Sequence, residues 1–270
     1  MRNAIDDKTN IAISTAASTL LIAGVIAVFA TAGRAETQIK DGVKVTVTGK
    51  LRPTVLPRRG AAPIQIRLGG EIGLVGTGTL PRLTKLTIEL NRHGHLDVHG
   101  LPRCRTRDIR PSTTREALNK CGAALVGEGS FSANVKLPEQ SPFPSEGKVL
   151  AFNGRYRGRP AILAHIYGTE PLPTSYVLPF TVGRSSGAYG TALETEFPEV
   201  TGEWGYVTGL KMNLHRRFTY RGQTRGYLSA GCPAPKGLTL APFTLARTSF
   251  EFDSGLAIST TLNRTCRVRK

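Results

Sequence analysis

The stretch Val43-Lys44-Val45-Thr46-Val47-Thr48 alternates valine with polar residues without a break. A period of two places the valines on one face of a strand and the polar residues on the other. The same alternation recurs at residues 64–68 and 86–90, and it is clearest from Leu210 to Tyr220. We therefore predict half-buried β-strands along most of the chain, with 210–220 as one continuous strand.

Short turns separate several further runs of apolar and β-branched residues, which indicates β-hairpins. The expected strand pairs are 149–153 with 161–167, 176–182 with 188–194, and 243–252 with 256–262. One helix is expected at 114–121, because Thr113 and Glu116 have the spacing of a capping box and Gly122 follows. Many strands and one short helix predict an all-β protein, either an antiparallel β-sandwich or a barrel-like fold.

The first 35 residues predict export from the cytoplasm. Residues 11–30 are mainly apolar and end in the small-residue sequence Ala30-Thr31-Ala32, which is typical of a cleaved signal peptide. At ~1.5 Å per helical residue this run also reaches the ~30 Å of a bilayer core, so an uncleaved signal anchor stays open. Both interpretations make 36–270 an extracellular or cell-surface β domain, with a seam expected near 138–146. The membrane is contacted only if the leader is uncleaved.

Four cysteines, Cys104, Cys121, Cys232 and Cys266, are expected to form two disulfides in an exported chain. Three pairings are open. We favour Cys104 with Cys121 and Cys232 with Cys266, because each of these pairs closes a local loop. The paired C-x-x-C spacing of a structural zinc site is absent from the sequence.

The chain is strongly basic, with 36 lysines and arginines, 19 acidic residues and a formal charge of +17. Outside the cytoplasm such a charge favours anionic envelope polymers or lipid surfaces, and we expect no nucleic acid partner. Arginine forks bind phosphate and carboxylate. The candidate anion-binding residues are Arg155, Arg157 and Arg159, with Arg103, Arg105, Arg107 and Arg110 near Cys104. The alternative is that these arginines only solvate turns.

A second candidate site is the segment from His93 to His99. If it is one strand, His93, His95, Asp97 and His99 share a face and could ligate zinc. The segment resembles the H-x-H-x-D-H signature of metallo-β-lactamase-type hydrolases, although Val98 separates Asp97 from the next histidine. A metal-dependent hydrolase is therefore the alternative function. The competing interpretation is a turn at 91–94 with Leu96 and Val98 facing the core.

No catalytic residue is predicted. Gly183-Arg184-Ser185-Ser186-Gly187 matches the G-x-S-x-G pattern of a nucleophile elbow, but the residues that follow do not indicate the helix which that motif requires. A glycine turn is the expected structure. Apart from zinc in the hydrolase alternative, no cofactor is predicted.

Four blocks, 101–104, 121–127, 150–154 and 231–235, together resemble an uncharacterised group of exported, cysteine-containing β-rich proteins of high-GC actinobacteria. The resemblance implies export and β architecture, and it carries over no catalytic residue. The sequence therefore predicts an exported, non-enzymatic protein of the cell envelope with a binding or structural role.

Overall fold

The computed structural model describes residues 35–136, 139–197 and 205–269. The chain divides into two compact units, Met1–Ala30 and Thr31–Lys270, and the description below concerns the second. The expected signal peptide or anchor lies outside the described residues. Within the described ranges, no helix has the length and apolar character needed to cross a membrane.

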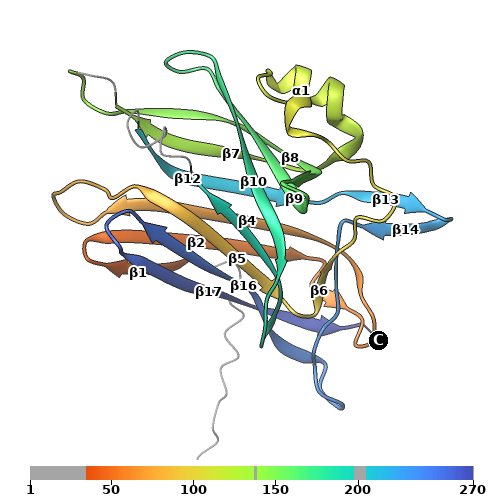
Figure 1. Ribbon diagram of the computed structural model, residues 1–270. Coiled ribbons are helices and arrows are strands. Elements are labelled where there is room, and N and C mark those ends of the chain that lie inside the picture. The colour runs from red at the N-terminus through yellow and green to blue at the C-terminus, as the bar shows by residue number, and fades with distance from the viewer. Residues whose placement is uncertain (1–34, 137–138, 198–204, 270) are drawn as a thin grey trace, which may run out of the picture. The chain divides into compact units, whose positions relative to one another are not determined.

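The second unit consists of strands with one α-helix (Figure 1). The elements are β1 (Glu36–Lys40), β2 (Val43–Arg52), β3 (Val55–Leu56), β4 (Ala62–Leu74), β5 (Leu83–Asn91), β6 (Gly94–Leu96), α1 (Thr114–Cys121), β7 (Leu125–Val135), β8 (Phe143–Tyr156), β9 (Arg159–Gly168), β10 (Thr174–Arg184), β11 (Tyr189–Glu196), β12 (Gly205–Leu214), β13 (Arg217–Tyr220), β14 (Gln223–Gly226), β15 (Leu228–Ala230), β16 (Leu240–Phe252) and β17 (Ala257–Val268).

The strands form one 15-stranded sheet and a separate two-stranded ribbon of β13 and β14. The order in the large sheet is β1-β2-β4-β12-β7-β8-β9-β10-β11-β5-β16-β17-β3, with β15 and β6 added at the start of β4. Among the described strands every ladder is antiparallel except that of β17 with β3. The sheet curls into a half-barrel, which confirms the all-β prediction.

The curl brings β17 back against β1 and β2, where side chains rather than a ladder connect them. Arg264 donates from Nε to the Gly49 carbonyl at 2.7 Å, and Lys40 donates from Nζ to the Ala257 carbonyl at 3.4 Å. A Cβ at Gly49 would lie only 2.8 Å from Leu262 Cδ1. Glycine at this position therefore lets β2 approach β17 closely.

The alternation in the sequence places the core as expected. Val43, Val45 and Val47 are buried inside the curl and their polar neighbours face outward. The expected seam near 138–146 overlaps the start of β8, where β8 pairs with β7 from Phe143 to Phe152. Residues 31–270 form one unit there.

A second, smaller core lies on the outer face of β8 and β9. Leu150 and Phe152 point outward from β8 and are covered by the segment that contains Ile109, Ala117 and the disulfide between Cys104 and Cys121. Because β8 is buried on both faces, its sequence is continuously apolar over residues 149–152.

Helix α1 has the predicted bounds, and both hydrogen bonds of the capping box between Thr113 and Glu116 are formed. Gly122 occupies the C-cap position, but its φ of −56° is right-handed. The expected glycine at the end of the helix is therefore confirmed, and its right-handed conformation lets the chain continue into a 3₁₀ turn at Gly122–Ala124.

Both favoured disulfides are present, Cys104 with Cys121 and Cys232 with Cys266, with Cα–Cα distances of 5.5 and 5.7 Å. Two disulfides indicate an oxidising environment such as the extracellular space.

The prediction of one strand from Leu210 to Tyr220 is wrong. Strand β12 ends at Leu214, because the next two amides, His215 and Arg216, both donate to the single carbonyl of Val126. This turns the chain out of the sheet, and β13 pairs with β14 instead. Alternation continues across the break, so periodicity alone could not reveal it.

Candidate functional site

Many of the described arginines lie at one end of the half-barrel. Leu214 of β12 lies opposite Gly127, which lies opposite Ala151 of β8, so β12 and β8 run in the same direction and finish at the same end. We call it the cationic end. Its exposed or partly exposed arginines include Arg103, Arg105, Arg107, Arg110, Arg155, Arg157, Arg159, Arg184, Arg217, Arg221 and Arg225.

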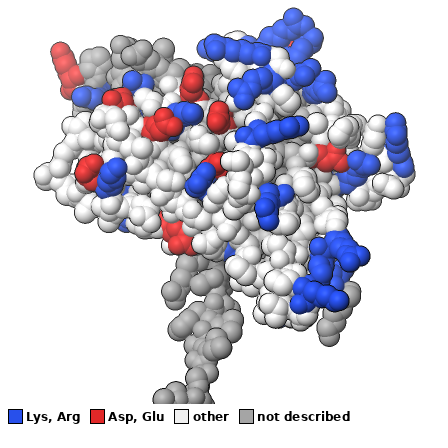
Figure 2. Space-filling model, turned by 60° about the horizontal axis from the view of Figure 1, so that its bottom comes forward, with Lys and Arg blue, Asp and Glu red and all other residues white. Residues whose placement is uncertain are grey.

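Charges at the other end, where β8 begins, are mixed. There the described acidic residues Asp41, Glu139, Glu146, Glu170, Glu196, Glu251 and Asp253 lie among Lys40, Lys44, Arg82, Lys85 and Lys148. In Figure 2 lysines and arginines gather at the upper and right edges of the view, and acidic side chains lie mostly in its left half. The excess positive charge is therefore concentrated at one end of the sheet.

The hairpin between β8 and β9 forms the first part of the cationic end. Arg157 and Gly158 make its two-residue turn with φ angles of 47° and 79°. Left-handed φ is uncommon for a residue with a side chain, and asparagine is the usual non-glycine choice. The Arg157 guanidinium lies 5.2 Å from the ring centroid of Tyr156. Arg155 and Arg159 are exposed on either side, so all three predicted anion-binding residues lie together.

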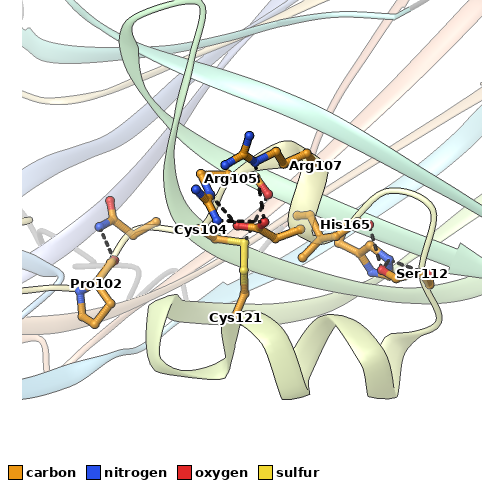
Figure 3. The surroundings of a disulfide bond; sticks show 10 residues. Pro102, Cys104, Arg105, Arg107, Ser112, Cys121 and His165 are labelled. Atoms are coloured by element: carbon orange, nitrogen blue, oxygen red, sulfur yellow. Dashed lines mark hydrogen bonds and ion pairs between the residues drawn. A yellow bond between two sulfur atoms is a disulfide. The ribbon is translucent and has the colours of Figure 1, made fainter.

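The loop with the other predicted arginines is fastened directly beside this hairpin. The Cys104 amide donates to the Asn153 carbonyl at 2.8 Å, and Asn153 Nδ2 donates to the Pro102 carbonyl at 2.8 Å. Gly154 permits the contact, because a Cβ there would lie 2.8 Å from the Cys104 carbonyl oxygen. Figure 3 shows how the disulfide from Cys104 to Cys121 ties the loop to α1.

Asp108 is the acidic residue within this loop, and two arginines share it. Arg105 donates to both of its carboxylate oxygens at 2.8 and 3.2 Å, while Arg107 Nε lies 3.9 Å away (Figure 3). The hydrogen bonds from Arg105 hold the pKa of Asp108 below its ordinary value. Among the described residues no acidic partner lies within ion-pair distance of Arg103, Arg110, Arg155 or Arg159. These guanidinium groups are available to an external anion.

A second arginine tip, missed from the sequence, lies at the same end. Tyr220-Arg221-Gly222 forms the turn between β13 and β14, with a φ of 49° at Arg221 and its guanidinium 5.3 Å from the Tyr220 ring centroid. Arg225 approaches the same ring at 5.4 Å. The sequence contains a signal for this second tip, because its tripeptide Tyr220-Arg221-Gly222 repeats Tyr156-Arg157-Gly158.

The loop that begins at Asp97 connects the two tips. A Cβ added at Gly100 would lie 2.2 Å from the Tyr220 ring, so the ring rests directly on this glycine. Four residues later Cys104 bridges to Gly154 beside the first tip. Both tips and the intervening arginines therefore form one surface.

The candidate zinc residues do not share one strand. Strand β6 covers only Gly94–Leu96 and pairs with β15. His93 lies in a turn where its amide donates to Asn91 Oδ1 at 2.9 Å, while Leu96 and Val98 pack against the core. Across the described residues, no group of three or more His, Cys, Asp or Glu side chains is arranged to hold a metal ion.

Asp97 instead supports the second tip. It accepts hydrogen bonds from Arg225 Nη1 at 2.9 Å and from the backbone and ring of His99 at 3.0 and 2.9 Å. Partial burial alone would raise its pKa, but these hydrogen bonds from His99 and Arg225 hold the pKa of Asp97 below its ordinary value. The carboxylate therefore stays charged under the β13–β14 ribbon.

His165 of β9 lies buried beneath the segment that carries the arginine loop at 103–110. Its Nε2 is 2.9 Å from the Ser112 carbonyl and 3.2 Å from Ser112 Oγ, and its Nδ1 has no hydrogen-bond partner in the described structure (Figure 3). Burial lowers the pKa of His165, although the bond to Ser112 opposes the effect. The ring is held neutral and links β9 to the chain before α1.

Ser185 of the G-x-S-x-G pattern lies in the connection between β10 and β11, so a strand follows it and not a helix. Its hydroxyl donates to the Glu89 carboxylate, which also accepts from Arg247. Through these bonds Ser185 stabilises the turn between β10 and β11.

No family model, curated protein or solved structure matches the chain. Forked guanidinium groups on two rigid turns and one disulfide-tied loop can bind phosphate or carboxylate groups that are distributed along an extended partner.

Proposed function

We propose that the protein is an exported, non-catalytic binding protein of the cell envelope whose cationic end holds an anionic envelope polymer. The observation that supports this most is the convergence of the arginine loop at 103–110 with the hairpin tip at 155–159, through the bridge of Cys104 to Gly154. Cys104 and Gly154 are 50 positions apart in the sequence and lie side by side in the fold. Arginines that only kept turns soluble would not need this contact.

The shape of the surface favours a polymer. The guanidinium groups lie along an edge that extends from the second tip, past Gly100, to the first tip. A linear polyanion can contact such an edge at several points, and binding then weakens steeply with salt as counterions are released.

The decisive experiment measures binding of the exported, disulfide-bonded protein to polyphosphate and to polygalacturonate over a range of NaCl concentrations. The test variant is Arg155→Gln, Arg157→Asn and Arg159→Gln, in which asparagine suits the left-handed turn. The matched control, Lys44→Gln, Lys148→Gln and Lys211→Gln, removes the same charge from exposed outer-face positions away from the cationic end.

We expect the arginine variant to bind at least tenfold more weakly and to reduce the slope of log Kd against log salt by about 2, at roughly 0.7 per lost contact. The lysine variant should retain most of the affinity. Equal losses in both variants would show that net charge alone drives binding, which contradicts the proposal. Binding confined to vesicles containing phosphatidylglycerol, with none to either polymer, would replace the polymer by a lipid surface.

A further inference from the structure

The interior of the half-barrel contains an apolar cavity of about 80 Å³. Its walls come from both sides of the curl, with Val47, Leu68 and Met212 facing Ile88, Leu193 and Phe250. Protein interiors are normally packed to crystal density, so a void of this size is unusual.

One wall of the cavity lies where β4 has a glycine in its inward-facing row. Leu68, Gly70 and Ile72 face inward in turn, and a Cβ added at Gly70 would lie 3.6 Å from the Phe250 ring. That is ordinary van der Waals contact, so a β-carbon fits at this position without steric conflict. Glycine at position 70 provides no side chain to fill this space.

Water has little reason to fill the space. One water needs roughly 10–15 Å³ and two to four polar partners. The walls are almost wholly apolar, and the hydroxyl of the lining residue Thr248 already donates to the Thr260 carbonyl at 3.4 Å. An apolar cavity of this kind stays dry or takes an apolar ligand.

The cavity also communicates with solvent. Leu210, Met212, Ile88 and Val207 line it yet remain partly exposed. A ligand can therefore enter with one part and leave the rest outside. Its volume is about half that of an engineered cavity of ~150 Å³ that accepts benzene, which favours a narrow chain over a ring.

From these observations we infer that the half-barrel binds a hydrocarbon chain, with the methyl end of an acyl ligand seated among Leu68, Met212 and Phe250. This site is separate from the cationic end and does not depend on the function proposed above. Its ligand class is a linear acyl chain, whatever polar group that chain carries.

The test titrates the exported, disulfide-bonded protein with cis-parinaric acid in detergent-free buffer and follows the fluorescence that rises when this linear polyene enters an apolar site. Gly70→Val fills the cavity. Gly73→Val is the matched control, because Gly73 faces outward on the same strand and a Cβ there would meet no atom within 4 Å.

We expect saturable binding that falls at least tenfold in Gly70→Val and stays unchanged in Gly73→Val, with uncharged dodecanol displacing the probe. Thermal melting of both variants checks the fold, and Gly70→Val should melt no lower than Gly73→Val, since it fills a void. Absence of saturable binding, or equal binding by both variants, would overturn the inference. Binding that dodecanol cannot displace and that the Arg155, Arg157 and Arg159 substitutions abolish would assign the probe to the cationic end and would also overturn it.

Discussion

The two Tyr-Arg-Gly turns, at 156–158 and 220–222, have the same local structure on different supports. Their arginines adopt φ angles of 47° and 49° and lie 5.2 and 5.3 Å from the preceding tyrosine ring. The first turn ends a ten-residue ladder of β8 and β9 over a buried core, whereas the second ends a four-residue ribbon. Three residues therefore set the turn, and the surrounding structure sets how firmly it is held.

The supports also differ in chemistry. A disulfide, a helix and the neutral ring of His165 hold the surroundings of the first turn. The second depends on the contact between Tyr220 and Gly100 and on the ion pair of Arg225 with Asp97. Perturbations of one support should therefore leave the other turn unchanged.

Loss of the Cys104–Cys121 disulfide should have the largest effect. Replacing both cysteines by serine opens a loop with a sequence separation of 17, and we expect a loss of roughly 3 kcal/mol in the free energy of unfolding. Urea denaturation measures the loss, and hydrogen exchange should rise at 103–110 but not in the β13–β14 ribbon. Faster exchange in the ribbon as well would show that the two supports are coupled.

As the pH falls, the interactions that hold the turn at 156–158 should weaken at a higher pH than those that hold the turn at 220–222. Because the folded pKa of His165 is lowered from 6.5, its contribution is complete above about pH 6.5 and is lost as the pH falls from there through the lower folded pKa. The free energy of unfolding should fall by up to ~1.4 kcal/mol per pH unit from this group. Asp97, whose pKa is lowered from 3.8, should keep its ion pair until the pH falls below about 3.8.

Denaturation between pH 7 and pH 5 measures the effect of His165, with His165→Gln expected to remove this part of the slope. His215→Gln is the matched control, since His215 is an exposed histidine outside both supports. An unchanged slope in His165→Gln would contradict the assignment.

Removing the Asp97 carboxylate tests the second support. Asp97→Asn should cost about 0.2–1 kcal/mol, the range for partly exposed ion pairs, because Arg225 loses its charged partner. Hydrogen exchange in β13 and β14 should accelerate, with no change at 155–159. Faster exchange at 155–159 would mean that the loop from Asp97 to Cys104 transmits the change.

The smallest effects are expected from substitutions at the turns themselves. Arg157→Asn and Arg221→Asn should each change the free energy of unfolding by no more than about 0.5 kcal/mol, because asparagine tolerates the left-handed conformation. Polyphosphate binding should weaken in both, and more strongly in Arg157→Asn, whose neighbours Arg155 and Arg159 are exposed cations. A larger loss in Arg221→Asn would reverse the ranking of the two turns.

Local patterns predicted the local structure well. The valines at 43, 45 and 47 are buried as their alternation requires, the capping box at Thr113 starts α1, and both disulfides close local loops. These features depend on residues close in sequence or on the few pairings that four cysteines allow.

Features that depend on distant pairing were not predictable. The sequence already allows a turn at 91–94 with Leu96 and Val98 facing the core, and the structure confirms it, but nothing near His93 indicates that β6 pairs with β15. The meeting of Cys104 with Gly154 and the common direction of β8 and β12 arise only from the order of strands in the sheet. The sequence therefore predicts the arginines of the first tip as candidates. It does not predict the surface that they share with the second tip.

The separation of charge along the sheet gives the protein a large electric dipole moment. Near an anionic boundary, the torque on that dipole turns the cationic end forward before any atom touches, and the reach of the effect grows as ionic strength falls. Under the proposed function, most encounters with the polymer would then begin with the cationic end facing it. The rate of capture would therefore depend on rotation in the field as well as on translational diffusion.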